Sequence, residues 1–85
     1  MSVGTARGVE ISSDGNTVYV ADANNVLVAL DITTPASPSL VGVYDTEGEA
    51  RGVSISSDGN TAYVADFNNG LVIIDITNPA KPVEL

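Results

Sequence analysis

The apolar residues of this chain come in short runs rich in Val, Ile, Leu and Tyr, and Gly, Asp, Asn and Pro separate the runs. Runs of this kind, bounded by turn-forming residues, are typical of β-strands. No stretch combines a helical spacing of apolar residues with capping residues, so we expect an all-β chain. The expected strands are Gly8–Ser12, Thr17–Ala21, Val26–Ile32 and Ser39–Tyr44, then Gly52–Ser56, Thr61–Ala65, Leu71–Ile76 and a truncated strand at Val83–Leu85.

The segments between the runs predict how the strands are joined. Asp-Gly pairs occur at 14–15 and 58–59, and glycine accepts the positive φ that a tight hairpin requires. Proline cannot donate a hydrogen bond to a neighbouring strand, so it belongs in a turn or at an outer edge. The other joints contain Asn24, Asn25, Pro35 and Pro38 in the first half and Asn68, Asn69, Pro79 and Pro82 in the second. We therefore expect two antiparallel meanders of four strands each.

The third run of each half is apolar on both faces of the expected strand. Val26–Leu30 and Leu71–Ile74 show no alternation with polar residues. Strands that read this way are covered on both sides, and a four-stranded sheet gains such cover from similar sheets next to it. Stacking the sheets around an axis as blades gives a β-propeller, which is the fold class that we expect.

The two halves are copies of one unit. The segment that begins at Ala6 recurs from Ala50, a period of 44 residues, and 25 of 35 aligned positions are identical. We expect residues 1–49 to form a first propeller blade with an N-terminal closing segment, and residues 50–85 a second blade with a truncated outer strand. Two units are too few to complete a repeat fold, which needs at least about three.

Several short motifs resemble a known repeat family. Tyr-Val-Ala-Asp stands at 19–22 and 63–66, Leu-Val-Ile-Ile-Asp at 71–75, Asn-Pro-Ala-Lys-Pro at 78–82 and Val-Gly-Val-Tyr-Asp-Thr at 41–46. On these residues the chain resembles the LVIVD-type repeat family of bacterial and archaeal β-propellers, and the likeness covers almost the whole chain. The first copy departs from the motif with Leu-Val-Ala-Leu-Asp at 27–31. The resemblance implies a propeller fold and an extracellular or cell-surface parent, and it implies no common activity.

The repeat length predicts that copies of the chain associate. Two periods of 44 residues need 88 and the chain has 85, so three residues are missing, the counterparts of Gly42, Val43 and Tyr44. We expect the cut to lie in an outer strand that Met1–Val3 of a neighbouring copy rebuild in part. A blade face measures on the order of 300 Å². At about 25 cal/mol per Å², leaving it in water forfeits roughly 8 kcal/mol, comparable with the stability of a whole domain.

Homo-oligomerisation would then complete a closed ring. Copies with two blades each close into rings with even numbers of blades. The faces carry Val, Ile, Ala and Leu, and the chain has no Trp, which suits thin blades and favours a homo-tetramer of eight blades. A homo-trimer of six blades is the alternative.

Composition excludes several functions. The chain has no Cys and no His, so disulfides, thiolate catalysis and imidazole chemistry are excluded. Its net charge is -8, from 11 acidic and three basic residues, and this charge repels nucleic acids and anionic membrane surfaces. No targeting segment and no membrane-spanning run is present in the sequence given.

Two arginines are the first candidate site. Arg7 and Arg51 recur immediately before the innermost expected strand of each blade. Repeated around a ring they would form a cationic collar at the central channel, where an anion or water could bind. The alternative is that each guanidinium pairs with a neighbouring carboxylate and fixes the spacing of the blades. The expected partners are Glu10, Glu49 and Asp45.

Five carboxylates are the second candidate site. Asp22, Asp66, Asp45, Glu47 and Glu49 belong to loops that we expect on one face of the propeller. Clustered oxygens of this kind suit Ca²⁺, but no calcium-loop motif is present, and the alternative is a set of turn caps on a solvated acidic face. We expect Asp31 and Asp75 to accept backbone N–H bonds in turns, and Tyr19, Tyr63 and Phe67 to pack between blades rather than to form a sugar-stacking platform. Phe67 differs from the two tyrosines in following Asp66 in a loop, a position at which exposure is the alternative.

The leading hypothesis is a structural one. We expect a two-blade segment, designed or excised, that assembles into a ring and has no cofactor, no metal and no catalysis, because no nucleophile with its base and no phosphate loop is present. The alternative is a ligand- or protein-binding surface propeller that uses the acidic face or the arginine collar, with Ca²⁺ as one candidate ligand. An enzyme is the third option.

Overall fold

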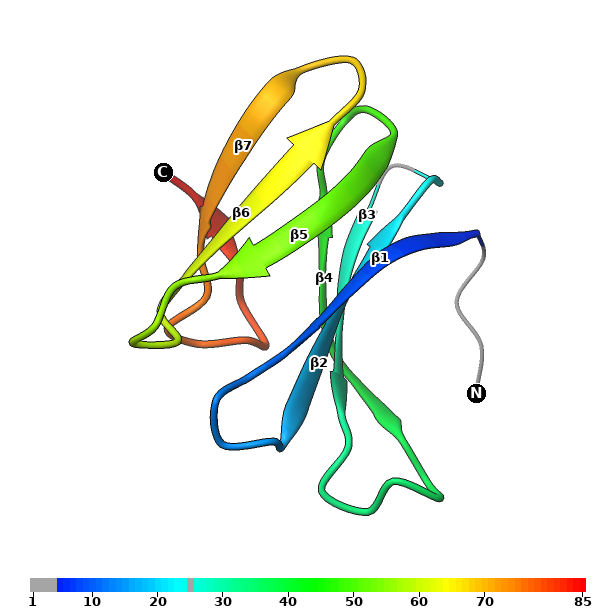
Figure 1. Ribbon diagram of the computed structural model, residues 1–85, viewed down its shortest axis with the longest axis vertical. Helices are drawn as coiled ribbons and strands as arrows, with labels where there is room; N and C mark the ends of the chain where they lie inside the picture. The colour runs from blue at the N-terminus through cyan, green and yellow to red at the C-terminus, as the bar shows by residue number, and fades with distance from the viewer. Residues whose placement is uncertain (1–4, 25) are drawn as a thin grey trace.

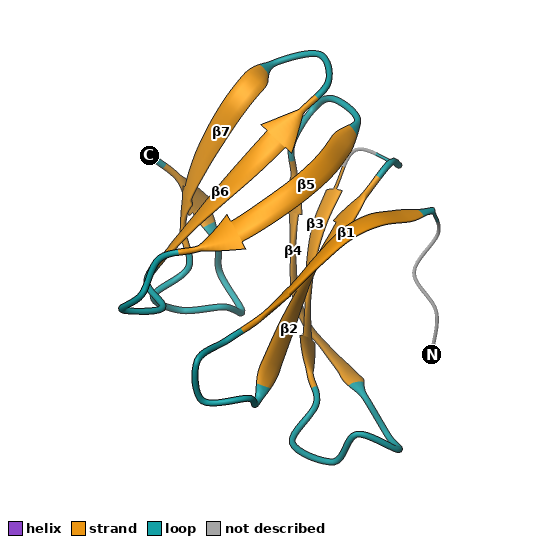
Figure 2. Ribbon diagram, viewed as in Figure 1, coloured by secondary structure: helices purple, strands orange, loops and turns teal. Residues whose placement is uncertain are grey.

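The chain folds into two four-stranded antiparallel sheets, each with its strands in sequence order (Figures 1 and 2). The computed structural model describes residues 5–24 and 26–85. The first sheet consists of β1 (Ala6–Ile11), β2 (Thr17–Asp22), β3 (Val26–Asp31) and β4 (Ser39–Asp45), and the second of β5 (Ala50–Ile55), β6 (Thr61–Asp66), β7 (Gly70–Asp75) and β8 (Val83–Glu84). The expectation of an all-β chain with two meanders is confirmed over these residues.

The inner strands begin earlier than the sequence predicts. We expected them to start at Gly8 and Gly52, but β1 starts at Ala6 and β5 at Ala50. Ala6 pairs with Asp22 across a register shift that ends at Gly8, and Ala50 does the same in the second sheet. An extra residue in one strand forms a β-bulge, and the strand pairing continues beyond it. The arginines therefore lie inside these strands and not before them.

The Asp-Gly turns have the geometry that the sequence predicts. Gly15 adopts a φ of 78°. Asp14 Oδ1 accepts hydrogen bonds from the hydroxyl of Ser12 at 2.6 Å and from the backbone N–H of Asn16 at 2.9 Å. The hydrogen bond from Ser12, followed by that from Asn16, holds the pKa of Asp14 below its ordinary value. The turn at Asp58 repeats these contacts.

One face of each sheet packs against the other sheet. We call the face of the first sheet that carries Tyr19, Ala21, Leu27 and Ala29 its A face, and the face of the second sheet that carries Ala62, Val64, Val72 and Ile74 its B face. All eight side chains are buried in a single cluster. The sheets therefore share one core between them, although each is a complete meander.

The remaining described residues add two observations. The last strand, β8, has two residues, and so the truncated strand is short as expected. The expected closing segment Met1–Val3 and the turn residue Asn25 lie outside the described residues. Within residues 5–24 and 26–85 there is no helix of the length and apolar character needed to cross a membrane.

Candidate functional site

The seam between the two sheets has a close backbone approach at its inner edge. A Cβ atom on Gly8 of β1 would lie 3.0 Å from Gly52 Cα and 3.2 Å from the carbonyl oxygen of Arg51, both in β5. Figure 1 shows these two strands side by side. A side chain at Gly8 would push the strands apart, so this glycine sets how closely the sheets meet.

The seam has a second close contact at its outer edge. A Cβ atom on Gly42 of β4 would lie 2.2 Å from the carbonyl oxygen of Pro79, in the turn that follows β7. Nearby, the hydroxyl of Tyr44 donates a hydrogen bond of 2.6 Å to Glu84 Oε1. Backbone contacts and one polar pair thus hold the outer strands of the two sheets together.

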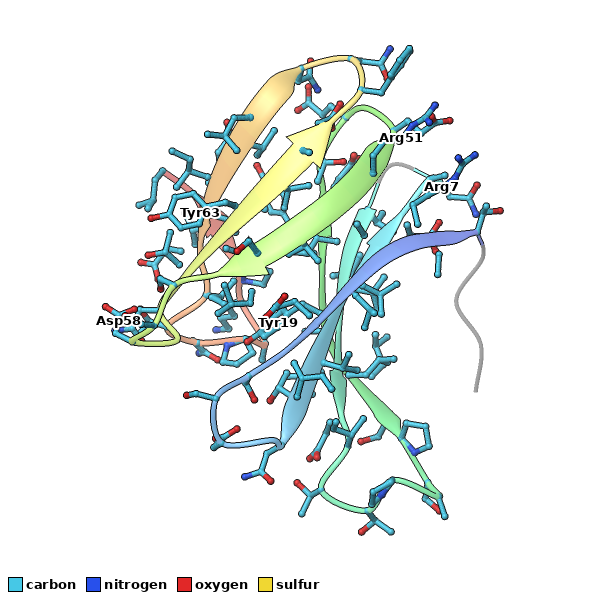
Figure 3. The ribbon with its side chains drawn as sticks, viewed as in Figure 1. Arg7, Tyr19, Arg51, Asp58 and Tyr63 are labelled. Atoms are coloured by element: carbon cyan, nitrogen blue, oxygen red, sulfur yellow. The ribbon has the colours of Figure 1, made fainter. Side chains whose placement is uncertain are left out.

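Each sheet also has a face that does not pack against the other sheet. Under the 44-residue period, the buried Tyr19 and Leu27 have their counterparts in Tyr63 and Leu71, which are 39% and 63% exposed. Figure 3 shows Tyr19 between the sheets and Tyr63 on the far side of the second sheet. We call this the open A face of the second sheet; it carries Tyr63, Ala65, Leu71 and Ile73.

The first sheet has the complementary open face. Val53 and Ile55 of β5 pack against the shared core, whereas their counterparts Val9 and Ile11 of β1 are 63% and 54% exposed. We call this the open B face of the first sheet; it carries Val9, Ile11, Val18, Val20, Val26, Val28, Leu30, Leu40 and Val43. Val20, Val28 and Leu30 are buried in a small cluster at its centre, and Val9, Ile11, Leu40 and Val43 are exposed around them. An apolar patch of this extent is the usual mark of an interaction surface.

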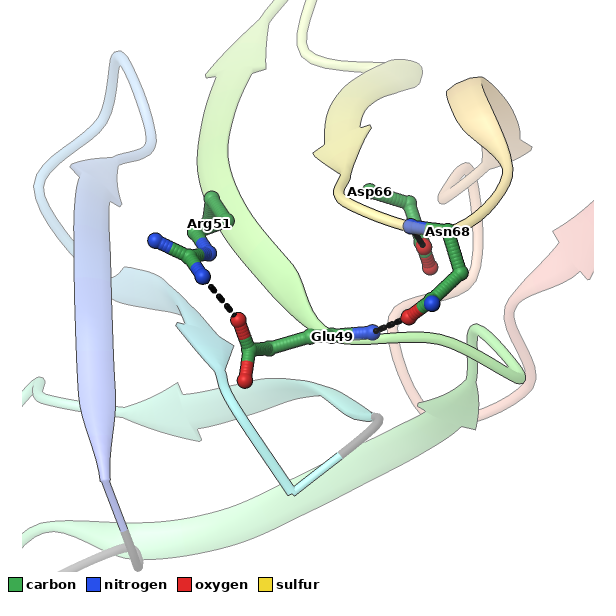
Figure 4. A network of polar contacts seen from close by, with 4 residues as sticks. All are labelled: Glu49, Arg51, Asp66 and Asn68. Atoms are coloured by element: carbon green, nitrogen blue, oxygen red, sulfur yellow. Dashed lines mark hydrogen bonds and ion pairs between the residues drawn. The ribbon is translucent and has the colours of Figure 1, made fainter.

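The arginine candidates differ in their surroundings. Arg51 forms an ion pair with Glu49 (Figure 4), and its guanidinium carbon lies 4.8 Å from the centre of the Phe67 ring. The expectation of a carboxylate partner is therefore confirmed for Arg51. Phe67 is 70% exposed, so within the single chain its loop position exposes it and it does not pack between the sheets. The first copy has Thr5 in place of Glu49 and Ala23 in place of Phe67.

Arg7 lacks that environment. Its side chain is exposed, and no ion pair involving it occurs among residues 5–24 and 26–85. Figure 3 places Arg7 and Arg51 at the same end of the two inner strands. The cationic collar stays a prediction, because it needs a closed ring.

The five acidic candidates lie at one end of the sheets, but they do not form a metal site. Asp22 and Asp45 both stand beside Val26 in the strand register, and Asp66 stands opposite Ala50. No three acidic side chains within the described residues come close enough to share an ion.

Asp22, Asp66 and Asp45 bind backbone N–H groups, as turn caps do. Asp22 Oδ1 accepts from Asn24 at 2.8 Å, and Asp45 Oδ1 accepts from Glu47 at 2.8 Å. The caps expected at Asp31 and Asp75 are also present, on the N–H groups of Thr33 and Thr77. The geometry at this end of the sheets favours the turn-cap interpretation over the calcium one.

Asp66 shows this role in most detail. It is 4% exposed, and its Oδ1 accepts hydrogen bonds from the backbone N–H groups of Asn68 and Asn69 at 2.9 and 3.0 Å. The side chain of Asn68 in turn accepts the N–H of Glu49 (Figure 4). A Cβ atom on Gly48 would lie 2.1 Å from Asp66 Oδ1. The loop between the two sheets is thereby fastened to the loop between β6 and β7.

The Tyr44–Glu84 hydrogen bond predicts a stability effect at alkaline pH. The hydrogen bond to Glu84, with partial burial and nearby negative charge, raises the pKa of Tyr44 to about 12. The phenol must keep its proton to donate, and its pKa is raised on folding, so the stabilisation is complete below pH 10 and is lost as the pH rises towards 12. It is at most about 1 kcal/mol, because the pair faces solvent.

Urea unfolding of the original chain and of Tyr44→Phe tests this at a series of pH values. We expect the original chain to be more stable at pH 7 and the difference to shrink between pH 10 and 12. A difference that stays constant over this range would contradict the assignment.

Sequence reasoning did not identify the glycine contacts. Gly8 and Gly42 lie within strands, where glycine is uncommon and often marks a close approach of another backbone. That signal was available in the sequence, but which backbone approaches depends on how the sheets pack.

Comparisons with known proteins agree with this architecture. A search of the curated proteins found no match. A solved structure, described as that of a functionally unknown protein from Desulfotomaculum acetoxidans DSM 771, is similar to this chain with a TM-score of 0.84 and 22% identity. The match covers 100% of this chain and 27% of that protein, so the chain spans about a quarter of its length. At this identity the likeness supports the fold alone.

The repeat itself has a family assignment. The LVIVD repeat matches twice, at residues 3–46 and 47–85. These segments correspond to the two sheets, and the resemblance seen in the sequence motifs is confirmed. The chain belongs to the LVIVD repeat family.

Proposed function

We propose that this chain is a structural unit that supplies two blades of a β-propeller, and that copies associate head to tail into a closed ring. The tetramer of eight blades is the favoured assembly, and the trimer of six blades is the alternative. The observation that carries the proposal is that the two open faces are the repeat counterparts of the two faces packed inside the chain. We treat each sheet as one blade from this point on.

The packing inside the chain supports a head-to-tail arrangement. An A face meets a B face there, so the two sides of the seam use different residues. A contact between unlike surfaces passes from copy to copy and forms a ring when the rotation closes. The open A face of one copy has Tyr63 and Leu71 where the seam has Tyr19 and Leu27, and it therefore suits the open B face of the next copy.

Light scattering behind size exclusion tests the proposal. One chain has a mass of 8.7 kDa. We expect a species of four times 8.7 kDa, about 35 kDa, for the tetramer and about 26 kDa for the trimer. A folded monomer at every concentration from micromolar upwards would overturn the proposal.

A charge placed on the open A face provides the matching variant. Leu71 is 63% exposed in the single chain, so Leu71→Lys is expected to leave each chain folded. In the assembly it would bury an unpaired ammonium group, and we expect the main species to become the monomer. Ala36→Lys adds the same charge at an exposed turn residue outside both faces and should leave the mass unchanged. Assembly of Leu71→Lys with unchanged affinity would contradict this use of the face.

The second candidate function, binding of a ligand or protein at the acidic loops or the arginines, stays a hypothesis. The acidic candidates Asp22, Asp66 and Asp45 are engaged by backbone N–H groups, and Arg51 by Glu49. No contact among residues 5–24 and 26–85 favours this function over the structural one.

A further inference from the structure

The two glycines at the inner edge of the blades are repeat counterparts with different surroundings. The Cβ direction of Gly8 points across the seam, where backbone atoms of β5 lie at 3.0, 3.2 and 3.5 Å. The Cβ direction of Gly52 meets only the side chain of Ala65, at 3.9 Å, which is an ordinary van der Waals distance. The single chain therefore has room for a methyl group at Gly52, whereas a methyl group at Gly8 would force the backbone of β5 to move by a few tenths of an ångström.

The backbone conformation at Gly52 does not require glycine either. Among the described residues, the glycines with positive φ are Gly15, Gly59 and Gly70. A glycine inside a strand weakens the strand through its extra freedom in the unfolded state. Neither the space around Gly52 nor its φ explains why this position has no side chain.

The counterpart in the first blade supplies the explanation. At Gly8, the space that a side chain would need is taken by the inner strand of the next blade. We infer that Gly52 is the point at which a second copy of this chain docks, with the β1 backbone around its Gly8 resting against β5 of the first copy. This inference rests on the proposed function and names the contact that sets the spacing between copies.

The docking contact is directional. The Cβ direction of Gly52 points toward the second copy, whereas that of Gly8 in the second copy points toward its own β5. A methyl group at Gly52 thus obstructs the contact between copies, and one at Gly8 obstructs the seam inside each chain. The two substitutions add the same methyl group, and each affects only one of the two contacts.

Alanine at each glycine tests the inference, with mass measured by light scattering over a dilution series and folding measured by circular dichroism. We expect Gly52→Ala to keep the β-sheet spectrum and the melting midpoint of the dilute chain and to raise the dissociation constant of the assembly at least tenfold. Gly8→Ala should lower the melting midpoint of the dilute chain. Ser57→Ala, at an exposed turn residue whose side chain enters none of the described hydrogen bonds, is the control and should change neither quantity.

A measurement on the original chain keeps the inference testable if Gly52→Ala does not fold. In a ¹⁵N-labelled sample, the amide signals of Gly8 and Gly52 should change between the diluted chain and the assembly. Those of Gly15 and Gly59, where a Cβ atom would meet nothing within 4 Å, should not change.

The outcomes separate the two proposals. Assembly of Gly52→Ala with unchanged affinity, or an unchanged Gly52 signal on assembly, would overturn the docking role and leave the ring proposal intact. An original chain that stays monomeric would overturn the ring proposal, and the docking role with it.

Discussion

Ile74→Ala is expected to lower the free energy of unfolding by about 2–5 kcal/mol. Ile74 is completely buried in the core between the two sheets, so the substitution leaves a cavity that both sheets line. A domain of this size has a total stability of about 5–10 kcal/mol. The variant therefore loses a large share of its stability, and a substantial unfolded population is expected at ordinary temperature.

The neighbouring isoleucine provides a matched control. Ile73 lies on the open A face and is only partly buried, so Ile73→Ala removes the same atoms without leaving a closed cavity. Urea unfolding followed by circular dichroism, on chains dilute enough to be monomeric, compares the two variants. An equal loss of unfolding free energy for both variants would contradict the placement of Ile74 in the core that the two sheets share.

Gly42→Ala is the second substitution with a large expected effect. The added Cβ atom would lie 2.2 Å from the carbonyl oxygen of Pro79 and 3.2 Å from Ala80 Cα. Both neighbours are backbone atoms, so the strand or the turn must move as a unit. Overpacking of this kind costs about 1–3 kcal/mol, and we expect a loss of unfolding free energy near the upper end of that range.

Val43→Ala is the control for the strand itself. Val43 is next to Gly42 but lies on the open B face and is 47% exposed. We expect it to cost less than about 1 kcal/mol in the same unfolding experiment. If Gly42→Ala were as mild as Val43→Ala, the outer edges of the two sheets would not meet as described.

The local structure was predictable from the sequence because its signals are local. The Asp-Gly pairs at 14–15 and 58–59 form the expected hairpins, and the carboxylates of Asp31 and Asp75 cap the expected turns. Each of these contacts joins residues a few positions apart. The expected start of β1 is two residues later than the observed one. Ala6 pairs with Asp22 beyond a register shift, and no residue type in this run predicts such a shift.

The packing was not predictable in the same way. Tyr19 and Tyr63 occupy the same position in nearly identical repeats, and we expected both to be packed between blades. One is 3% exposed and the other 39%. Tyr19 is buried because the second sheet packs against its face, whereas no sheet of the same chain packs against the face of Tyr63. The sequence of a single repeat does not show which of its faces another sheet covers. The pairing of Arg51 with Glu49 does not extend to Arg7 for a different reason, which the sequence itself shows: the first copy has Thr5 at the position of Glu49.

The small side chains in the shared core have a consequence for the symmetry of the proposed ring. Ala29 and Ala62 narrow the seam inside the chain, whereas their counterparts on the open faces are the larger Ile73 and Val18. A ring of copies would then alternate junctions lined by small side chains with junctions lined by larger ones. Eight blades would show fourfold and not eightfold rotational symmetry, and the junctions between copies, which no covalent link crosses, are the points at which the ring opens.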